Sequence, residues 1–438
     1  MRLHLSNRTR ALGFGAASIL LIVGCSAAPQ AGSPGTSGTA EPSPTASVAA
    51  SPSLTPPSLP SAAPSPSASS LPVVATAPSG PWSRLDWIDA GAVVPIGPLN
   101  VSVDGWSGGY VALEQTGGSD ENGNDIPVVI RSSASSDGLH WAAAATVDTA
   151  GIVGSIEITK IVEGPSGLLA LGYPVGDTCG GPATVVALWT SADGGTWRRV
   201  TLPKDFRTGQ VHTIDGGSAG FIATGSRADG TTQALWTSPD GRTWTSRPLP
   251  KVSSGTLVLD GATSFAGGFV LAGAVLGEGE CGGPAHLHAA TWWSADGAAW
   301  SRSALPGSMT AAGARIGVQA ISDRVVVVTQ TSPDDSKLLA WTSTDGRSWT
   351  AVHAPSDLLT RGPVTDGRHA ALMMDPDSGS GAPNVLAVGE DAGITTLGQS
   401  GNGPIASEDG PGSTFAVGPT GILVVRSDGG AAWLGLPS

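Results

Sequence analysis

The chain has 438 residues, including 63 Gly and 34 Pro, while charged residues make up only 13% and aromatic residues 5%. This composition argues against a helical enzyme and is typical of β-structure combined with a low-complexity segment. The formal net charge is -13, with only 22 Lys and Arg residues, which argues against nucleic acid as a partner, since binding to phosphate backbones depends on clustered basic side chains.

Residues 1–25 have the features of an export signal. Arginines near the start precede an apolar run over residues 11–24, which is too short to span a bilayer comfortably. The run ends in Leu-Ile-Val-Gly-Cys25, which resembles the lipobox of bacterial lipoproteins. The resemblance implies that Cys25 is acylated and that the lipid holds the chain on the outer face of the cytoplasmic membrane or at the cell surface. A signal peptide with an incidental cysteine, or a retained helix, is the alternative.

Residues 26–79 consist largely of Pro, Ser, Ala, Thr and Gly, with Glu41 as the single charged residue and no aromatic residue. Such a segment cannot bury enough apolar surface to offset the entropy lost on ordering. We therefore expect a disordered tether between the lipid and a folded domain over residues 80–438.

One short unit recurs within the folded region. Four copies span residues 189–197, 236–244, 292–300 and 341–349, and a fifth at 135–141 lacks the leading Trp. Each copy has an apolar strand, an Asp-Gly turn and a second strand that opens with Trp, which predicts a β-hairpin. The Asp carboxylate can accept N–H groups of its own turn, and the Trp can pack between neighbouring sheets.

Two further predicted strands precede each hairpin, so that a unit of about fifty residues holds four strands. Repeats of this kind are typical of the blades of a β-propeller. We expect an all-β fold, a β-propeller with seven blades, and keep six blades as the alternative. The N-terminal strand that begins at Trp82 is expected to complete the last blade, because ring closure removes the exposed sheet edge.

The repeated turn resembles the Asp-box, or bacterial neuraminidase repeat, of sialidase-type propellers, in a form that is one residue shorter. The resemblance covers most of residues 80–438. In that family the box is a structural turn between the third and fourth strands, which implies a structural and not a catalytic role for the box residues. These are Asp137, Trp141, Asp193, Trp197, Asp240, Trp244, Asp296, Trp300, Asp345 and Trp349.

The catalytic set of the sialidases is not recognisable in the sequence. That chemistry uses a Tyr nucleophile paired with Glu, an Asp acid/base and three Arg that hold the substrate carboxylate, together with an Arg-Ile-Pro motif, which is absent here. Both tyrosines, Tyr110 and Tyr173, lie in predicted second strands, where we expect them to pack. The hypothesis we favour is therefore that the folded region is a monomeric, non-enzymatic domain that binds a protein or glycan or acts as a scaffold. A lipid-anchored glycoside hydrolase is the alternative, because two suitably spaced carboxylates suffice for that reaction.

The loops opposite the Asp-box turns are rich in acidic residues. Only Arg227 and Lys337 oppose them, so we expect a negative rim that favours a cation or a basic partner. Simple solvation of exposed loops is the alternative. The acidic residues are Asp120, Glu121, Asp125, Asp177, Asp229, Glu278, Glu280, Asp334, Asp335, Asp375 and Asp377.

Two segments hold side chains of the types that bind metals, although we expect no cofactor. One alternates oxygen ligands as calcium loops do, but its Gly is not at the sixth place. The other places two His on one face of a strand, near a Cys, as a soft metal would require. The alternatives are thus Ca²⁺ at Asp120, Asn122, Asn124 and Asp125, and a soft metal at His286 and His288.

Cys179 and Cys281 lie in equivalent loops, each followed by Gly-Gly-Pro. Outside the cytoplasm two cysteines fit one disulfide, but non-adjacent blades can hold the sulfur atoms too far apart, so a bonded pair and two free thiols both stay open. Trp87, Trp106 and Trp293 fall outside the repeat and are candidates for stacking on a ligand.

Overall fold

The computed structural model describes the chain in parts between residues 82 and 437. Within these parts no helix combines the length and the apolar character needed to cross a lipid bilayer. The described residues are 82, 84–91, 101–119, 125–150, 152, 155–175, 187–276, 287–307, 316–330, 338–353, 364–374, 384–388, 394–396, 398–400, 413–426 and 431–437.

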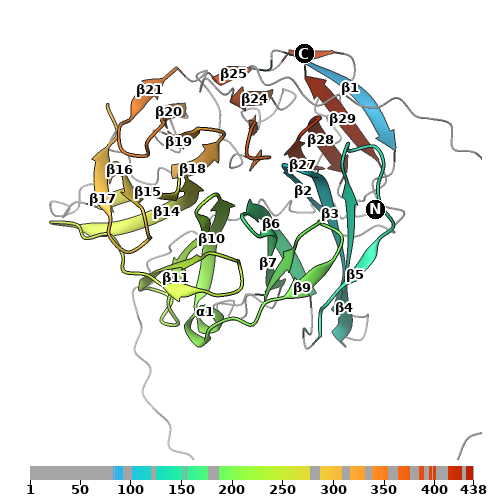
Figure 1. Cartoon of the computed structure of the whole chain (residues 1–438), viewed down its shortest axis with the longest axis horizontal. Helices are drawn as coiled ribbons and strands as arrows, with labels where there is room; N and C mark the ends of the chain where they lie inside the picture. The colour runs from blue at the N-terminus through green and yellow to red at the C-terminus, as the bar shows by residue number, and fades with distance from the viewer. Residues whose placement is uncertain are drawn as a thin grey trace, which may run out of the picture. The chain divides into compact units, whose positions relative to one another are not determined.

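The described strands form seven sheets that follow one another around a ring (Figure 1). We number them as blades in chain order. Blade 1 consists of β2 (Val101–Trp106), β3 (Gly109–Ser119), β4 (Asp125–Ser135) and β5 (Ala145–Val147). Blade 2 consists of β6 (Ser155–Gly164), β7 (Gly167–Val175), β8 (Ala187–Ser191) and β9 (Trp197–Arg199). Blade 3 consists of β10 (Gln210–Gly217), β11 (Gly220–Ser226), β12 (Gln233–Ser238) and β13 (Thr245–Ser246).

Blades 4 to 6 repeat this four-stranded antiparallel order. Blade 4 consists of β14 (Thr256–Phe265), β15 (Gly268–Leu276), β16 (Leu287–Ser294) and β17 (Ser301–Ala304). Blade 5 consists of β18 (Ile316–Ile321), β19 (Arg324–Gln330), β20 (Leu338–Ser343) and β21 (Thr350–Val352). Blade 6 consists of β22 (Val364–Thr365), β23 (Ala370–Met374), β24 (Asn384–Val388) and β25 (Ile394–Thr396).

Blade 7 has five strands from both ends of the described chain. Its order is β26 (Gly398–Ser400), β1 (Arg84–Gly91), β29 (Ala432–Pro437), β28 (Gly421–Arg426) and β27 (Ser413–Gly418). β1 pairs antiparallel with β29, with Asp89 opposite Trp433, and β26 covers the other edge of β1 in parallel. The N-terminal strand therefore closes the last blade as expected, and the seven sheets agree with the preferred blade number.

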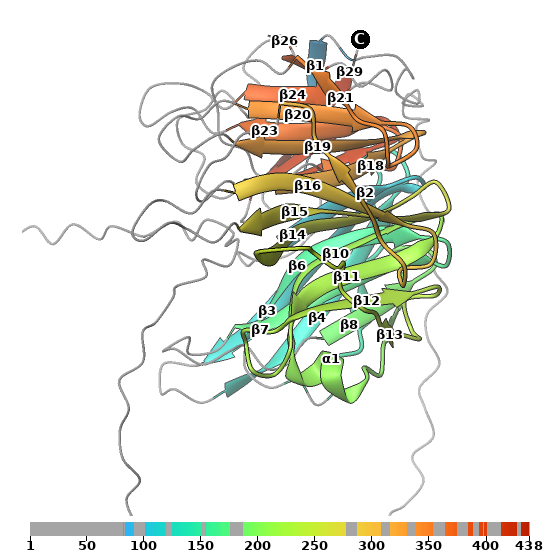
Figure 2. The same ribbon diagram turned by 90° about the vertical axis from the view of Figure 1, so that its left-hand side faces the viewer.

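In blades 1 to 6 the first strand in chain order is the inner strand, the one nearest the ring axis. In blade 7 the inner strand is β27. The inner strands β2, β6, β10, β14 and β18 contact one another in this order, and β27 contacts both β2 and β22. Blades 5 and 6 are joined by a 2.7 Å hydrogen bond from the N–H of Ser322 to the carbonyl of Gly367. A view turned by 90° shows β14, β15 and β16 between the strands of the neighbouring blades (Figure 2).

The hydrophobic core lies between adjacent blades. One cluster joins Leu169 and Leu171 of blade 2 to Phe221 and Trp236 of blade 3. The Trp residues that open the repeats lie on third strands and are at most 2% exposed in blades 2 to 5, where they fill the space between sheets. The short helix α1 (Lys204–Thr208) adds Phe206, whose ring centroid is 4.9 Å from that of Trp236.

Candidate functional site

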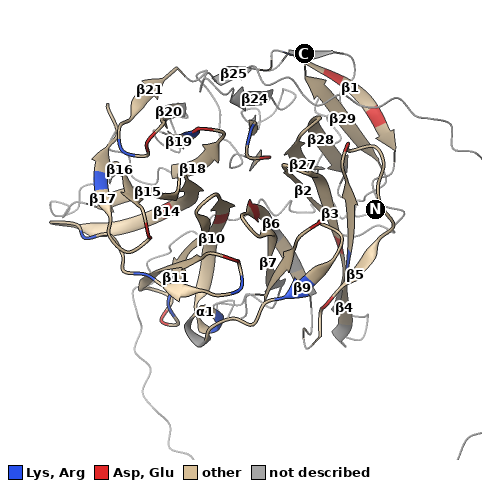
Figure 3. Ribbon diagram, viewed as in Figure 1, with Lys and Arg blue, Asp and Glu red and all other residues tan. Residues whose placement is uncertain are grey.

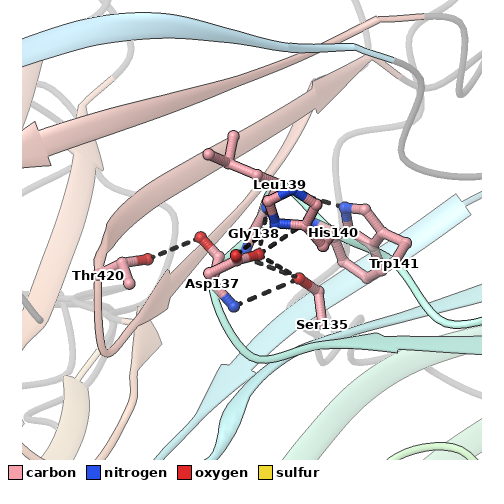
Figure 4. Close-up of polar contacts among 7 residues, drawn as sticks. All are labelled: Ser135, Asp137, Gly138, Leu139, His140, Trp141 and Thr420. Carbon is pink, nitrogen blue, oxygen red and sulfur yellow. Dashed lines mark hydrogen bonds and ion pairs between the residues drawn. The ribbon is translucent and has the colours of Figure 1, made fainter. Parts of the chain in front are cut away.

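The Asp-Gly turns between third and fourth strands share one hydrogen-bond pattern. In the turn after β4, Asp137 Oδ1 accepts the N–H groups of Leu139 and His140, both at 2.8 Å, and Ser135 Oγ accepts that of Gly138 at 2.9 Å (Figure 4). Burial acts to raise the pKa of Asp137, but hydrogen bonds from the side chain and backbone of His140 and from Leu139 outweigh it and lower the pKa. The carboxylate is thus held within its own turn.

In each of the other four turns the Asp carboxylate likewise accepts two backbone N–H groups of its own turn. Hydrogen bonds from backbone N–H groups are the main cause that lowers the pKa of the turn carboxylates, to about 2 in Asp345. The indole N–H groups of Trp197 and Trp244 donate to the carbonyls of Gly194 and Gly241 in their own turns, at 2.9 and 3.0 Å. The remaining turn carboxylates are those of Asp193, Asp240 and Asp296.

A different polar cluster lies on the inner strands. Asp215 of β10 accepts a hydrogen bond at Oδ2 from Nε2 of Gln319 on β18, at 3.3 Å, and Lys160 Nζ of β6 lies 3.9 Å from its Oδ1. Blade 4 separates the blades of Asp215 and Gln319 in the ring. Because one carboxylate reaches residues of blades 2 and 5, it must point toward the ring axis. Asp215 and Gln319 are buried, whereas the Lys160 side chain is 39% exposed.

Asp104 on β2 completes this group, which we call the axial cluster: Asp104, Lys160, Asp215 and Gln319. Asp104 Oδ2 accepts the N–H of Ile161 on β6 at 3.1 Å. Burial raises the pKa of Asp104 to about 7; the positive charge of Lys160 lowers it and the negative charge of Asp215 raises it. Near neutral pH the Asp104 carboxyl group is therefore partly protonated, and the axial cluster combines it with the amino group of Lys160 and the amide group of Gln319.

Three adjacent inner strands carry a β-bulge at the same level. The pairing register with the second strand skips one residue at Thr159 in β6, at His212 in β10 and at Asp260 in β14, and each of these residues lies five residues before the end of its strand. Bulges of this kind redirect a side chain and are frequent next to active sites.

Glycines on the second strands accommodate two of these bulges. A Cβ atom at Gly225 would lie 1.8 Å from the carbonyl oxygen of Gln210, and one at Gly273 would lie 2.1 Å from that of Val258. Neither the axial cluster nor the bulges could be recognised in the sequence. The glycine that recurs in the second strands, in Leu-Gly-Tyr, Thr-Gly-Ser and Ala-Gly-Ala, was the available signal.

The expected lipidation site, the two loop cysteines and most of the expected metal ligands lie outside the described residues. This holds for Cys25, Cys179, Cys281, His286 and the calcium-loop residues Asp120, Asn122 and Asn124. Asp125 and His288 are described as strand positions, opposite Ser119 and Val275. In the part of the chain that is described, no group of three or more His, Cys, Asp or Glu side chains could hold a metal ion.

The expected acidic rim is represented by few described residues. Asp229, in the loop between β11 and β12, accepts the N–H groups of Thr231 and Thr232 at 2.9 and 2.7 Å. Hydrogen bonds from the hydroxyl and N–H of Thr232 lower the pKa of Asp229 to about 2. Its carboxylate is thus ionised and fixed by its own turn.

The aromatic candidates lie against the core. Trp87, Trp106 and Trp293 are half-buried and pack on three different hydrophobic clusters, and the Arg347 guanidinium lies 3.6 Å from the Trp293 ring centroid. Tyr110, on β3, is fully buried and donates its hydroxyl to the carbonyl of Gly421 at 2.9 Å. Tyr173, on β7, packs on the cluster between blades 2 and 3. Both tyrosines therefore pack in second strands, as expected.

No protein-family model and no curated protein matches the sequence. Similar solved structures include the β-propeller domain of the Trilobed protease from Pyrococcus furiosus, with 9% identity and a TM-score of 0.44 over 76% of this chain and 92% of that chain. The NanB sialidase of Streptococcus pneumoniae has 15% identity and a TM-score of 0.33 over 82% and 71%. The Aleuria aurantia lectin, a six-bladed β-propeller, has 13% identity and a TM-score of 0.36 over 72% and 98%. These likenesses concern the fold alone.

Proposed function

We propose that the protein is a lipid-anchored, non-enzymatic β-propeller that binds its ligand at the axial cluster. The observation that carries this proposal is the meeting of Lys160, Asp215 and Gln319 from three separate blades. Paired strands hold these side chains in place, and binding sites built on such elements are more sharply defined than sites on loops. Donors and acceptors occur together, which suits a ligand rich in hydrogen-bonding groups.

Anchoring belongs to the same proposal. Acylation of Cys25 places the chain outside the cytoplasmic membrane, and residues 26–79 hold the propeller of residues 80–438 away from the lipid surface. The Asp-Gly turns act as structural Asp-boxes, which is supported by carboxylates that bind the N–H groups of their own turns.

Glycoside hydrolysis is the second candidate, and one observation favours it. Asp104 and Asp215 act on each other through their charges, and the pKa of Asp104 lies near 7. A carboxylic acid beside an ionised carboxylate is the minimal set for general acid catalysis with a nucleophile or base.

Binding and hydrolysis are separated by one set of measurements on the purified full-length protein. Glycan arrays and pull-downs detect a ligand, and product analysis of the bound glycans detects turnover. We expect Asp215→Asn to weaken binding by about tenfold or more, a loss of roughly 1.4 kcal/mol, with no turnover by the wild type. The control is Asp229→Asn, which changes a carboxylate held by an exposed turn. Turnover that Asp104→Asn abolishes would decide for the hydrolase.

The anchor is tested separately by metabolic labelling with a fatty-acid analogue. Wild-type protein should carry the label and sediment with membranes, and Cys25→Ser should do neither. A labelled Cys25→Ser protein would contradict lipidation at this residue.

A further inference from the structure

The end of each blade that carries the Asp-Gly turns is also the end at which the described chain begins. In an antiparallel blade, the turn between the first and second strands and the turn between the third and fourth strands lie at the same end. Thr420, between β27 and β28, donates its hydroxyl to the Asp137 carbonyl in the Asp-Gly turn of blade 1. Trp82 stacks on His369, between β22 and β23. We call this end of the ring the Asp-box face, and the chain that precedes Trp82 therefore reaches the propeller there.

Blades 2 to 5 carry basic residues on their Asp-Gly turns and fourth strands, which span residues 192–199, 239–247, 295–304 and 344–352. The acidic residues of these segments are the box aspartates alone, although the whole chain has 35 Asp and Glu against 22 Lys and Arg. Each box carboxylate accepts two N–H groups of its own turn. Figure 3 shows basic segments, coloured blue, on β9 and β17, the outer strands of blades 2 and 4. We call the basic residues the arginine arc: Arg198, Arg199, Arg242, Arg247, Arg302 and Arg347.

Contacts between blades hold part of the arginine arc in place. Nε of Arg242, in blade 3, donates to Oγ1 of Thr190, in blade 2, at 3.4 Å. Arg198 lies directly opposite Thr190 in the register of β8 and β9, and opposed residues of antiparallel strands point to the same side of a sheet. Two arginines of adjacent blades therefore flank one threonine. The guanidinium of Arg347, in blade 5, lies 3.6 Å from the ring centroid of Trp293, in blade 4.

The positive charges of the arc are available to a partner. Arg198, Arg242, Arg302 and Arg347 are exposed. Among the described residues, no ion pair engages any arginine of the arc. Exposed guanidinium groups bind phosphate oxygens through paired hydrogen bonds. The loops between second and third strands, at the opposite end of the blades, are those in which the sequence is rich in acidic residues. The two ends of the propeller thus differ in charge, which orients a molecule near a charged surface.

We infer that the Asp-box face of blades 2 to 5 docks on a membrane of anionic phospholipids, with the arginine arc against the headgroup phosphates. This inference rests on the proposed anchoring at Cys25. The chain that would carry the lipid joins the propeller at the face that bears the arc, so the anchor brings this face to the membrane. A tether also keeps the local concentration of the domain high at its own membrane, and each arginine near an anionic surface adds to the attraction.

The test measures vesicle binding by full-length Cys25→Ser protein, which must bind through its own surface. Sedimentation compares vesicles of phosphatidylcholine with vesicles of equal parts phosphatidylcholine and phosphatidylglycerol. Binding to the anionic vesicles should be stronger by about tenfold or more, and high salt should weaken it by screening. Within this background Arg198→Gln and Arg302→Gln should each reduce binding by about fivefold.

The matched control is Arg227→Gln, an exposed arginine in the loop between β11 and β12, at the opposite end of blade 3. It should bind as the Cys25→Ser protein does. The apolar run of residues 11–24 is common to all these proteins, so differences among them report the propeller surface. Thermal unfolding checks that each variant is folded. Hydrogen exchange of the wild-type protein in the two vesicle types gives a second readout: the amides of β17 should exchange more slowly on the anionic vesicles, and those of residues 227–232 should not change.

The outcomes separate the docking face from the anchor on which it rests. Equal binding to both vesicle types, or binding that Arg198→Gln and Arg302→Gln leave unchanged, would overturn the docking face even if Cys25 is labelled with lipid. Binding to soluble poly(glycerol phosphate) but to neither vesicle would also overturn it, in favour of a phosphate polymer. Absence of lipid on Cys25 would contradict the anchor, whereas arginine-dependent binding to the anionic vesicles would still support the docking face.

Discussion

The indole ring of Trp82 stacks on the imidazole ring of His369, with centroids 4.7 Å apart and planes inclined by 27°. Trp82 precedes β1 of blade 7, whereas His369 ends the turn between β22 and β23 of blade 6. Asp366 holds His369 by accepting its N–H at 2.7 Å and lies 3.2 Å from its Nδ1. The start of the described chain is therefore joined to blade 6 as well as to blade 7.

This contact predicts a large effect of Trp82→Ala. Trp82 is 2% exposed, and truncation of a buried tryptophan costs about 3–5 kcal/mol. Equilibrium unfolding in urea should show this loss, and Trp82→Phe should recover part of it. Trp300→Ala is the control, since Trp300 is half-buried and should cost less. Equal losses in Trp82→Ala and Trp300→Ala would contradict a role of Trp82 in closing the ring.

The Asp-Gly turns predict that Asp137→Ala destabilises the propeller by about 1–3 kcal/mol, because two N–H groups lose a charged acceptor. The same turn is tied to blade 7 by the Thr420 hydroxyl, which donates to the Asp137 carbonyl at 3.1 Å (Figure 4). Since the native pKa of Asp137 is lowered, the wild type should lose its greater stability over Asp137→Ala as the pH falls through the native pKa of Asp137.

Asp229→Ala provides the comparison for this turn. Asp229 also accepts two N–H groups, but from an exposed loop within one blade. The loss of stability in Asp229→Ala, measured by thermal unfolding, should be smaller than that in Asp137→Ala. A larger loss would show that the Asp137 turn contributes no more to stability than an exposed loop within one blade.

Asp104 predicts a distinct pH dependence of stability. Its native pKa is raised from an ordinary 3.8 to about 7 by burial. Between these values the native state keeps the proton that the unfolded chain has lost, so this group makes the protein less stable as the pH rises. The free energy of unfolding of Asp104→Asn minus that of the wild type should therefore rise from pH 3.8 to about 7 and then level off. A difference that is constant with pH would show that Asp104 titrates normally.

The bulge on β10 predicts that Gly225→Ala is poorly tolerated. The new methyl group would meet the Gln210 carbonyl at 1.8 Å, so one of the two strands must move, and overpacking of this kind costs about 1–3 kcal/mol. Gly195→Ala is the control, because its Cβ would meet no atom closer than 3.7 Å. Chemical denaturation measures both variants. Stability of Gly225→Ala equal to that of Gly195→Ala would mean that the bulge relaxes without cost.

Local patterns in the sequence were sufficient for the blades. An Asp-Gly turn between apolar strands acts through residues that are neighbours in the chain, so each hairpin could be predicted from its own segment. The turn residues of Asp137 and Asp345 illustrate this, since their main partners lie two and three positions away. Ring closure by β1 also followed from the repeat, because an incomplete last unit and a spare first strand complete one another.

The axial cluster was decided only by the tertiary structure. Gln319 and Asp215 are 104 positions apart and meet because the ring curves around its axis. A bulge shifts the register by one residue and reverses the direction of the side chains that follow, yet it changes neither composition nor hydrophobic pattern enough to be recognised. The raised pKa of Asp104 likewise comes from burial between inner strands. Turns depend on nearest neighbours in the chain, whereas a site at the axis depends on side chains that only ring closure brings together.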